Sequence, residues 1–505
     1  MVSNTFFNYS LYCYFSGFFS FFIELSLFFF IIFNILFIEI NLKKKKMNFY
    51  FFLSFLIILL LYAFFILFFN FNIYILNFSL QNNYYIFLGK IFCLCLIINI
   101  LYIIKNKLLE NIYSLNLKDF FCIICFLLIF LCILLSSVDF FIMFLSLEGI
   151  SFILYTLGTI LKTSYINLEA ILKYFLINNI ASSLLLWSIS YVYIIINSTD
   201  CYEFQYFLIY SFEIIHLQQI YPVCILLVIS LLFKLAVFPF HWWIADIYEG
   251  FWTPLTLLYA VLIKFVLFLF FFNFFFNILS SCYFLKSFLV YSAIGSILYG
   301  SLGAVVQIKL KRFLAYTSIS QSGYILLGLT SNTMHGFFSS FLYLIFYTLA
   351  SLAFFLILLN LEHILHKQNI IYLNQLYSVF FYNKEITFHL ICILFIMAAF
   401  PPFNSFFIKF FILLLVLEQK MEFLIGLILI ISLISVFYYL NLIQQLLFFK
   451  INKTKIYLFN TNYFFLVFLR FCIFLFLLPA VVLSKIYLFC YFFITNFLWP
   501  LSILL

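Results

Sequence analysis

The sequence predicts an all-α polytopic membrane protein with about fourteen transmembrane helices, two inverted five-helix repeats and broken seventh and twelfth helices. Hydrophobic residues make up 68% of the 505 residues and charged residues only 8%. A soluble domain carries about 25% charged residues, so this chain cannot cover itself with polar surface. Apolar runs such as LSLFFFIIFNILFIEI are continuous. They indicate helices, because the strands of a membrane barrel alternate polar and apolar residues.

Each predicted span is an apolar run long enough to cross a bilayer, with a short polar segment on either side. In order, the spans lie at 13–40, 47–70, 84–104, 119–137, 139–160, 169–197, 221–241, 254–276, 285–306, 310–330, 336–360, 386–417, 421–448 and 463–495. The chain is expected to divide into helices one to three (1–118), a first repeat (119–276), a second repeat (285–448) and a C-terminal helix with a tail (449–505).

The basic residues provide an independent test of this count. If the loops are numbered in order, the odd-numbered loops hold sixteen Lys and Arg residues and the even-numbered loops hold two. Positive charge remains on the side from which a membrane protein is inserted. The odd-numbered loops are therefore predicted to face the interior, and both termini are predicted to face outward.

Two of the predicted spans contain proline well inside an apolar run. Pro239 lies in FKLAVFPFHWW of the seventh span, and Pro401 and Pro402 lie in FIMAAFPPFNSFFIKF of the twelfth. Proline removes a helix hydrogen bond, and a bilayer tolerates the freed backbone only where protein or water satisfies it. The breaks are five spans apart, which predicts a five-helix repeat whose second copy is inverted. Such paired breaks mark the transport path of many carriers.

Three lysines lie in the middle of apolar runs, namely Lys234, Lys264 and Lys409. A charge at that depth costs about 3 kcal/mol on insertion scales, so these lysines are candidate functional residues facing a bundle interior or a wet cavity. The alternative is that they snorkel or form static ion pairs. Snorkelling is the interpretation for Lys90 and Lys485, which lie nearer the ends of their spans.

Four stretches between residues 139 and 417 carry a specific resemblance. The segment FKLAVFPFHWWIADIYEGFWTPLTLLYAVLIKF resembles the signature of the antiporter-like membrane subunits of respiratory complex I. Its DIYEG and TP motifs favour the NADH dehydrogenase subunit 2 branch over the subunit 4 and 5 branches. FLSLEGISFILYTL, LEAILKYFLINNIASSLLLWSISYVY and LKRFLAYTSISQSGYILLGL resemble the fifth, sixth and tenth helices of that branch, in consistent order. The resemblance implies a fourteen-helix fold with two inverted repeats.

The resemblance also assigns roles by position. Glu148 corresponds to the glutamate of the fifth helix, and Lys173 matches a lysine of the sixth. Lys234, Lys264 and Lys409 correspond to the lysines of the broken seventh, the eighth and the broken twelfth helices. We expect Glu148 to set the charge state of Lys234. Lys264 would then pass the proton across the middle of the subunit, and Lys409 would exchange it toward the outer face.

Some positions depart from the family pattern or remain open. Ala245 stands where proline is usual, and Gln321 stands where histidine is common. The residues around the second break, AAFPPFNSF, are bulkier than usual. His241 is a secondary candidate for the proton path, or else it caps the first break. Asp246 and Glu249 are placed in an interior-side loop, where they attract protons, pair with another subunit or only shape the loop.

The function implied by the resemblance is that of a proton-translocating membrane-arm subunit of NADH:ubiquinone oxidoreductase, driven by redox chemistry elsewhere in the complex. The chain is expected to bind no cofactor and no metal, with NADH, FMN, iron–sulfur clusters and ubiquinone in other subunits. Its expected partners are other membrane-arm subunits and lipids, not nucleic acid. Two alternatives remain, a subunit of a multi-subunit cation/proton antiporter and a structural spacer. The excess of residues with A/T-rich codons favours an organellar gene and therefore the mitochondrial inner membrane, with both termini on the intermembrane-space side.

Overall fold

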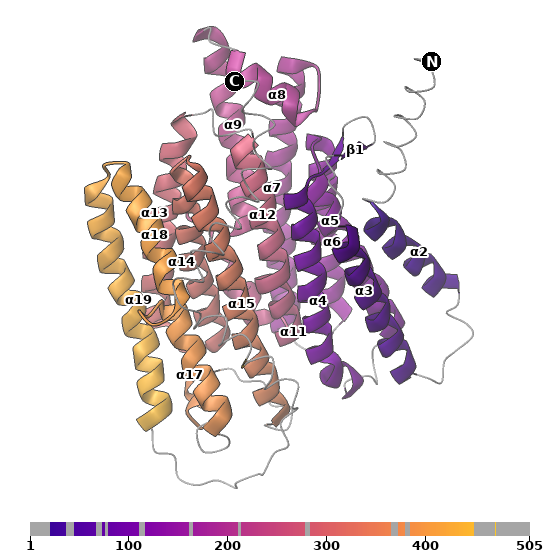
Figure 1. Ribbon diagram of the computed structural model, residues 1–505, viewed down its shortest axis with the longest axis vertical. Coiled ribbons are helices and arrows are strands. Elements are labelled where there is room, and N and C mark those ends of the chain that lie inside the picture. Colours follow the sequence, from indigo (N-terminus) through magenta and orange to yellow (C-terminus); the bar gives the residue numbers. More distant parts are fainter. Residues whose placement is uncertain are drawn as a thin grey trace.

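The computed structural model describes residues 21–36, 45–66, 73–75, 79–110, 117–160, 165–210, 214–277, 283–364, 372–378, 384–448 and 470. These residues form a bundle of roughly parallel and antiparallel helices, ordered broadly along the sequence from α2–α4 at one side to α19 at the other (Figure 1).

The elements follow the predicted spans closely. The N-terminal part contains α2 (Phe22–Leu36), α3 (Lys45–Ile66), β1 (Ile73–Ile75), β2 (Leu80–Asn82) and α4 (Tyr84–Glu110). The central part contains α5 (Leu117–Ser136), α6 (Phe140–Ile160), α7 (Tyr165–Ile196), α8 (Cys201–Tyr210), α9 (Ile214–Leu235), α10 (Trp243–Gly250), α11 (Thr253–Leu257), the π-helical turn η1 (Leu258–Ile263) and α12 (Lys264–Asn277). The C-terminal part contains α13 (Tyr283–Val306), α14 (Leu310–Thr330), α15 (Met334–Ile364), the 3₁₀ turn η3 (Leu373–Ser378), α17 (Lys384–Ala398), α18 (Asn404–Glu418) and α19 (Glu422–Phe448). The predicted span 463–495 lies, apart from Arg470, outside the described residues.

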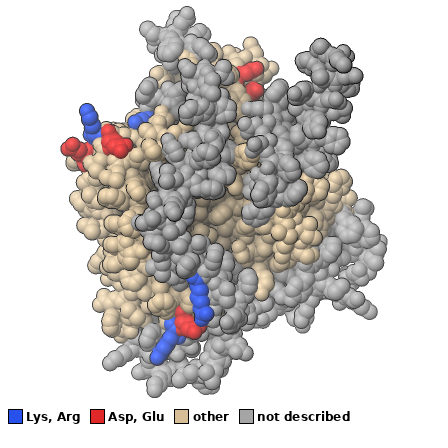
Figure 2. All heavy atoms as spheres, viewed as in Figure 1, with Lys and Arg blue, Asp and Glu red and all other residues tan. Residues whose placement is uncertain are grey.

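Length and composition identify the helices that can cross a bilayer. Among the described residues, eight helices are long and apolar enough, and three shorter apolar helices accompany them. On the face drawn in Figure 2, the described charged side chains gather toward the two ends of the molecule, and the described surface between them is uncharged. The chain is therefore a multi-pass, mostly helical membrane protein.

The prediction of a purely helical protein was wrong in one region. β1 and β2 form an antiparallel hairpin in which Ile73 pairs with Asn82. Isolated bridges also join Leu80 to Ser137 and Asp139 to Asp200. Strands of three residues are too short to show the alternation by which a strand is recognised in sequence. Helix α8 likewise forms within a segment that was predicted to be a loop between spans.

The two predicted helix breaks are present, and they share one backbone geometry. α9 is separated from α10, and α17 from α18, by short non-helical segments that contain the predicted prolines. Ala236 and Ala399 have φ angles of 55° and 56°. At each break this alanine donates to the carbonyl three residues back, and the following residue, Val237 or Phe400, donates to the carbonyl five residues back. Both breaks are thus Schellman helix ends, in which the left-handed residue turns the chain away from the helix axis.

The segment α11–η1–α12 is the most enclosed part of the bundle. An eighteen-residue window within Thr253–Phe275 is completely buried. Beyond Lys264, α12 reads FVLFLFFFNFFFN, so phenylalanine dominates its length.

Helices α13 and α14 approach each other closely through glycine. A Cβ atom added to Gly300 of α13 would lie 2.5 Å from the backbone nitrogen of Ser320 on α14. Small residues allow such close approach of helix backbones in membranes. This contact holds α14 beside the site described below.

Candidate functional site

A largely buried ion pair joins Glu148 of α6 to Lys234 in the last turn of α9. The Lys234 ammonium donates a hydrogen bond to Glu148 Oε1 at 3.2 Å and another to Asn178 Oδ1 on α7. The side chains of Lys234 and Glu148 are 8% and 17% exposed. A cation at the C-terminal end of a helix also meets the negative end of the helix dipole. The charge of Lys234 therefore has a carboxylate, an amide oxygen and a helix end as compensating partners.

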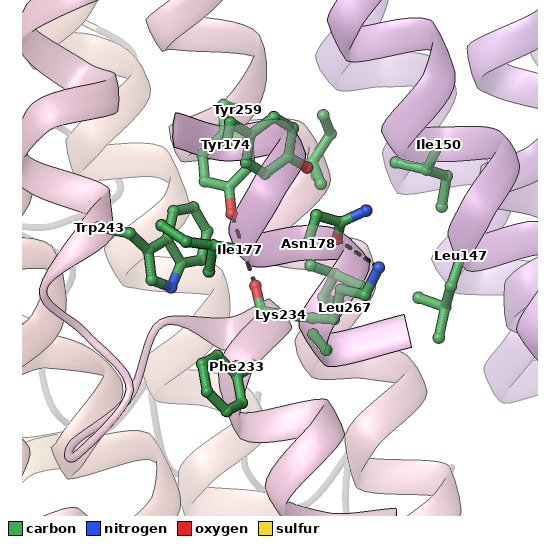
Figure 3. Close-up of a pocket in the computed structure, with 12 residues that line it drawn as sticks. Leu147, Ile150, Tyr174, Ile177, Asn178, Phe233, Lys234, Trp243, Tyr259 and Leu267 are labelled. Atoms are coloured by element: carbon green, nitrogen blue, oxygen red, sulfur yellow. Dashed lines mark hydrogen bonds between the residues drawn. The ribbon is translucent and has the colours of Figure 1, made fainter. Parts of the chain in front are cut away.

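A small cavity adjoins Lys234 (Figure 3). Its volume is about 20 Å³, and Asn178, Trp243 and Tyr259 are among its lining residues. A cavity of this size holds at least one water molecule if polar groups line it. The Tyr259 hydroxyl donates to the backbone carbonyl of Lys234 at 3.5 Å. The buried Trp243 Nε1 lacks a hydrogen-bond partner within the described part of the chain, which is the kind of group that ordered water satisfies.

Lys264 occupies the start of α12, directly after the π-helical turn η1. It is 3% exposed, and its ammonium donates to the backbone carbonyl of Ser318 on α14 at 2.9 Å. Among the described residues no carboxylate lies within ion-pair distance of it. π-helical turns inside α-helices occur frequently at functional sites. Lys264 is thus a buried amine whose one observed hydrogen-bond partner is a neutral backbone carbonyl.

Lys409 of α18 is 8% exposed and lies over the ring of Tyr324, with its Nζ atom 4.1 Å from the ring centroid. An ammonium over an aromatic face is stabilised by the ring quadrupole. The Tyr324 hydroxyl is buried and has no partner in the described ranges. The two lysines assigned to broken spans differ in position, because Lys234 lies before its break and Lys409 after its break.

Helix α14 touches both Lys264 and Lys409. The residues through which it does so, Ser318 and Tyr324, are six positions apart, which corresponds to a rise of about 9 Å. Gln321 lies between them on the same helix. Its amide donates to a backbone carbonyl of α17 at 3.4 Å and accepts from a tyrosine hydroxyl of α15. Gln321 therefore places a polar group between the two lysines, although an amide does not titrate as the expected histidine would.

Lys173 lies apart from these buried lysines. Its side chain is 43% exposed and pairs with Glu169 at 2.8 Å and with Asp246 at 2.9 Å. The structure thus places Lys173 in an ion cluster between α7 and α10, and not among the buried lysines.

Asp246 and Glu249 were predicted to lie in a loop, but they lie on helix α10. Arg312 of α14 bonds Asp246 at 3.0 Å and also pairs with Glu249. Lys309 pairs with Glu249 as well. The loop prediction failed because α10 has only eight residues, too few for a clear periodic signal. Both carboxylates have partners within this chain.

The prolines predicted to break helices lie between helices, at the two places predicted for them. Pro239 lies between α9 and α10, and Pro401 and Pro402 lie between α17 and α18. His241 is half-buried, and its ring lies 5.7 Å from the rings of Phe238 and Tyr299. Its Nδ1 atom is buried and unpartnered among the residues described. His241 therefore lines the break, and no hydrogen bond joins it to Lys234 in the described structure.

Lys90 does not snorkel, contrary to the prediction. It is fully buried, and its Nζ atom lies 2.5 Å from Glu24 Oε1. The prediction failed because α2 brings the carboxylate from 66 residues away in the sequence. Arg470 pairs with Glu385 at 3.8 Å on the surface. Lys485 lies outside the described residues.

Curated proteins with similar sequences are named as subunits of NADH-quinone or NADH-ubiquinone oxidoreductase. The chain is 33% identical to NADH-quinone oxidoreductase subunit N of Pelagibacter ubique over 325 residues, which cover 63% of this chain and 66% of the relative. It is also 33% identical to NADH-ubiquinone oxidoreductase chain 2 of Rhizopus oryzae over 318 residues, covering 62% of this chain and 60% of the relative. The match therefore spans slightly less than two thirds of the length of these relatives.

Solved structures share the fold at low sequence identity. A chain of respiratory complex I from Thermus thermophilus aligns with a TM-score of 0.73 at 21% identity, over 92% of this chain and 98% of that chain. A chain of the Mrp complex from a Dietzia species aligns with a TM-score of 0.74 at 17% identity, over 86% and 82%.

A family model covers the region that contains the site. The model described as NADH:quinone oxidoreductase/Mrp antiporter, TM matches residues 137–435. That range includes Glu148, Lys234, Lys264 and Lys409 as well as both helix breaks. The chain therefore belongs to the NADH:quinone oxidoreductase/Mrp antiporter transmembrane family.

Proposed function

We propose that the chain is a proton-translocating membrane-arm subunit of NADH:ubiquinone oxidoreductase, driven by redox chemistry elsewhere in the complex. The observation that carries the proposal is the buried Glu148–Lys234 pair, followed by two further buried lysines that share contacts with α14. The names of the similar proteins support the same enzyme. The chain itself binds no cofactor in this proposal. NADH, FMN, iron–sulfur clusters and ubiquinone act in other subunits.

The first step of the proposed mechanism is charge coupling between Glu148 and Lys234. Burial disfavours the charged form of an amine, and a nearby carboxylate favours it. While the 3.2 Å contact persists, Lys234 retains its proton. When Glu148 is drawn away by a charge change in a neighbouring subunit, Lys234 releases the proton to water in the adjoining cavity.

The later steps follow the helices that connect the lysines. Lys264 accepts the proton past η1 and passes it along α14, by way of water beside Gln321, to Lys409. Lys409 exchanges it toward the outer face. Lys173, with its carboxylate partners, supplies protons at the margin of this path, and His241 borders the break where water enters.

The proposed topology has fourteen transmembrane helices and two inverted five-helix repeats, at 119–276 and 285–448. The matching backbone geometry at Ala236 and Ala399 supports this repeat. In this topology both termini face the intermembrane space, and the protein resides in the mitochondrial inner membrane beside other membrane-arm subunits.

Substitution of the ion pair tests the proposal. Lys234→Met and Glu148→Gln should each lower proton pumping at least about tenfold, because each removes an ionisable member of the first pair. Pumping is measured as acidification per NADH oxidised, with the assembled complex in sealed vesicles. Lys384→Met, at an exposed position on α17, is the control. Normal pumping in both pair variants would refute the mechanism.

The second candidate function is that of a subunit in a multi-subunit cation/proton antiporter. The likeness to the Mrp complex chain, with a TM-score of 0.74, favours retaining it. A native gel of solubilised membranes distinguishes the two candidate functions. Co-migration of the chain with NADH dehydrogenase activity supports the first, and migration in a complex without that activity supports the second.

A further inference from the structure

The second helix break leaves two backbone carbonyls without a helical donor. In an α-helix each carbonyl accepts from the N–H group four residues later. Pro401 and Pro402 stand four residues after Met397 and Ala398, and proline has no backbone N–H group. The Schellman bonds of this break end on earlier carbonyls of α17. Inside a bilayer such freed carbonyls need a donor from another part of the protein or from water.

Gln321 of α14 supplies a donor to the first of these carbonyls. Its Nε2 atom donates to the Met397 oxygen at 3.4 Å, across 76 residues of sequence. The residue is 5% exposed. A distance of 3.4 Å is long for a hydrogen bond between nitrogen and oxygen. The contact therefore depends on how firmly the amide is held in place.

Tyr343 of α15 fixes the orientation of that amide. Its hydroxyl donates to Gln321 Oε1, and both side chains are buried. A backbone carbonyl can only accept, so the amide nitrogen must face Met397 and the amide oxygen must face Tyr343. The tyrosine hydroxyl must then be the donor. The two contacts together leave one orientation for the amide.

The same series of contacts continues to Lys409. The ring of Tyr343 lies 6.0 Å from the ring of Tyr324, within the range in which aromatic rings interact. Lys409 Nζ lies 4.1 Å from the centroid of the Tyr324 ring, on a helix that begins directly after the break. Gln321 thus contacts the chain before the break and connects through two tyrosine rings to the lysine after it.

The first break has a corresponding contact. The carbonyl of Lys234, two residues before the left-handed Ala236, accepts from the Tyr259 hydroxyl at 3.5 Å. Met397 likewise stands two residues before the left-handed Ala399. The same carbonyl of each break therefore meets a side-chain donor from another helical element. A donor at this place is a shared part of how both breaks are built.

We infer that Gln321 is a positioning residue for Lys409. Its amide holds the carbonyl that Pro401 leaves free, and it thereby fixes the direction in which α18 leaves the break. Lys409 is kept over the ring of Tyr324 as a result. An amide does not titrate, so Gln321 acts through its contacts and carries no proton itself. The consequence for transport rests on the proposed function, whereas the hydrogen bonds at the break do not.

Two substitutions at position 321 test the inference by their order. Gln321→Met keeps the length of the side chain but removes both hydrogen bonds. Gln321→His fits the space less well, but a neutral imidazole retains one donor and one acceptor. Positioning predicts more proton pumping in Gln321→His than in Gln321→Met, which should fall at least about tenfold below the unsubstituted protein. A packing role predicts the reverse order. Pumping is measured in sealed vesicles with the assembled complex, as acidification per NADH oxidised.

Two further variants separate the hydrogen bonds from general disturbance of α14. Tyr343→Phe keeps the ring and removes the hydroxyl that orients the amide, so pumping should fall. Added to Gln321→Met, it should change little more, because both substitutions act on one contact. Ser322→Ala is the control, since this buried hydroxyl donates to the carbonyl of Ile319 in its own helix. Its pumping should be unchanged.

The midpoint of thermal unfolding of the solubilised assembly gives a readout that does not depend on transport. Gln321→Met should have a lower midpoint than Gln321→His and Ser322→Ala, because the Met397 carbonyl then lacks its donor. Equal midpoints, or pumping in Gln321→Met at or above that in Gln321→His, would overturn the inference. If Gln321→Met does not assemble, Tyr343→Phe decides, and a normal midpoint with normal pumping there overturns it. Normal pumping in Lys234→Met would refute the proposed path, and the order of the midpoints would still decide the role of Gln321.

Discussion

At the scale of single residues, the three buried lysines differ in what supports their charge. Lys234 has a carboxylate and an amide oxygen, Lys264 has one backbone carbonyl, and Lys409 has an aromatic face. A carboxylate stabilises an ammonium more than a neutral acceptor does. Removal of Glu148 from Lys234 therefore changes the charge balance most at the first lysine of the series.

The amide of Asn178 should be essential to the first pair. Asn178→Leu removes a buried hydrogen bond to a charged group, which is worth about 1.5–3 kcal/mol, so we expect pumping to fall about tenfold or more. Proton pumping in sealed vesicles is the measurement. Asn179→Leu is the control, because Asn179 is the same residue type on the exposed face of α7. Equal loss in both variants would contradict the role of Asn178.

The sequence predicted the burial of Lys234, Lys264 and Lys409, and its family resemblance predicted Glu148 as the group that acts on Lys234, but it predicted neither the burial of Lys90 nor the contact between Lys234 and Asn178. Lys234, Lys264 and Lys409 interrupt apolar runs, and that pattern alone indicated burial. Asn178 and Glu148 are 56 and 86 residues from Lys234 in the sequence, and only the packing of three helices brings them together. Lys90 was misinterpreted for the same reason.

At the scale of elements, both helix breaks use alanine where glycine is the usual residue. A residue with a Cβ atom in the left-handed conformation costs about 1–2 kcal/mol. Ala236 and Ala399 both carry that cost, at equivalent places in the two breaks. The breaks therefore persist because the surrounding packing and the prolines hold them.

Glycine at the second break should stabilise the protein. Ala399→Gly relieves the left-handed backbone, so we expect about 1 kcal/mol of added stability and a higher midpoint of thermal unfolding. Ala398→Gly is the control one residue earlier. It lies in the last turn of α17, where glycine in place of alanine should destabilise by up to about 1 kcal/mol. The same sign for both variants would argue against backbone strain at Ala399.

Long elements were predictable and short ones were not. The ends of α13 and α14 agree with the predicted spans 285–306 and 310–330 within two residues, because a long apolar run has clear ends. The β1–β2 hairpin, α8, α10 and the π-helical turn η1 are short and have no comparable pattern in the sequence.

At the scale of the whole molecule, ion pairs join the two halves of the family region. In the sequence, α7 and α10 precede α13, and α14 follows it. Asp246 of α10 nevertheless pairs with Lys173 of α7 and with Arg312 of α14, and so links these three helices. Glu249 adds pairs to Arg312 and Lys309. The half-helix after the first break is thereby attached to the helix that contacts Lys264 and Lys409.

Loss of the central arginine should loosen this attachment. Arg312→Met removes two pairs that are partly exposed, so we expect a loss of about 1 kcal/mol, seen as a lower midpoint of thermal unfolding at low salt. High salt should narrow the difference from the unsubstituted protein, because exposed pairs are screened. Arg470→Met, which removes a single 3.8 Å surface pair, should change little. A salt-independent loss in Arg312→Met would point to packing instead of charge.

The phenylalanine-rich length of α12 gives the molecule an electrical property. Above Lys264 the helix offers FVLFLFFFNFFFN, most of it fully buried, and moving an ion into such a medium costs on the order of 20 kcal/mol before relaxation. This apolar length of α12 acts as an electrical insulator next to Lys264. The voltage across the membrane can fall over it without current, so in the proposed path a proton held at Lys264 leaves sideways along α14 and not along α12.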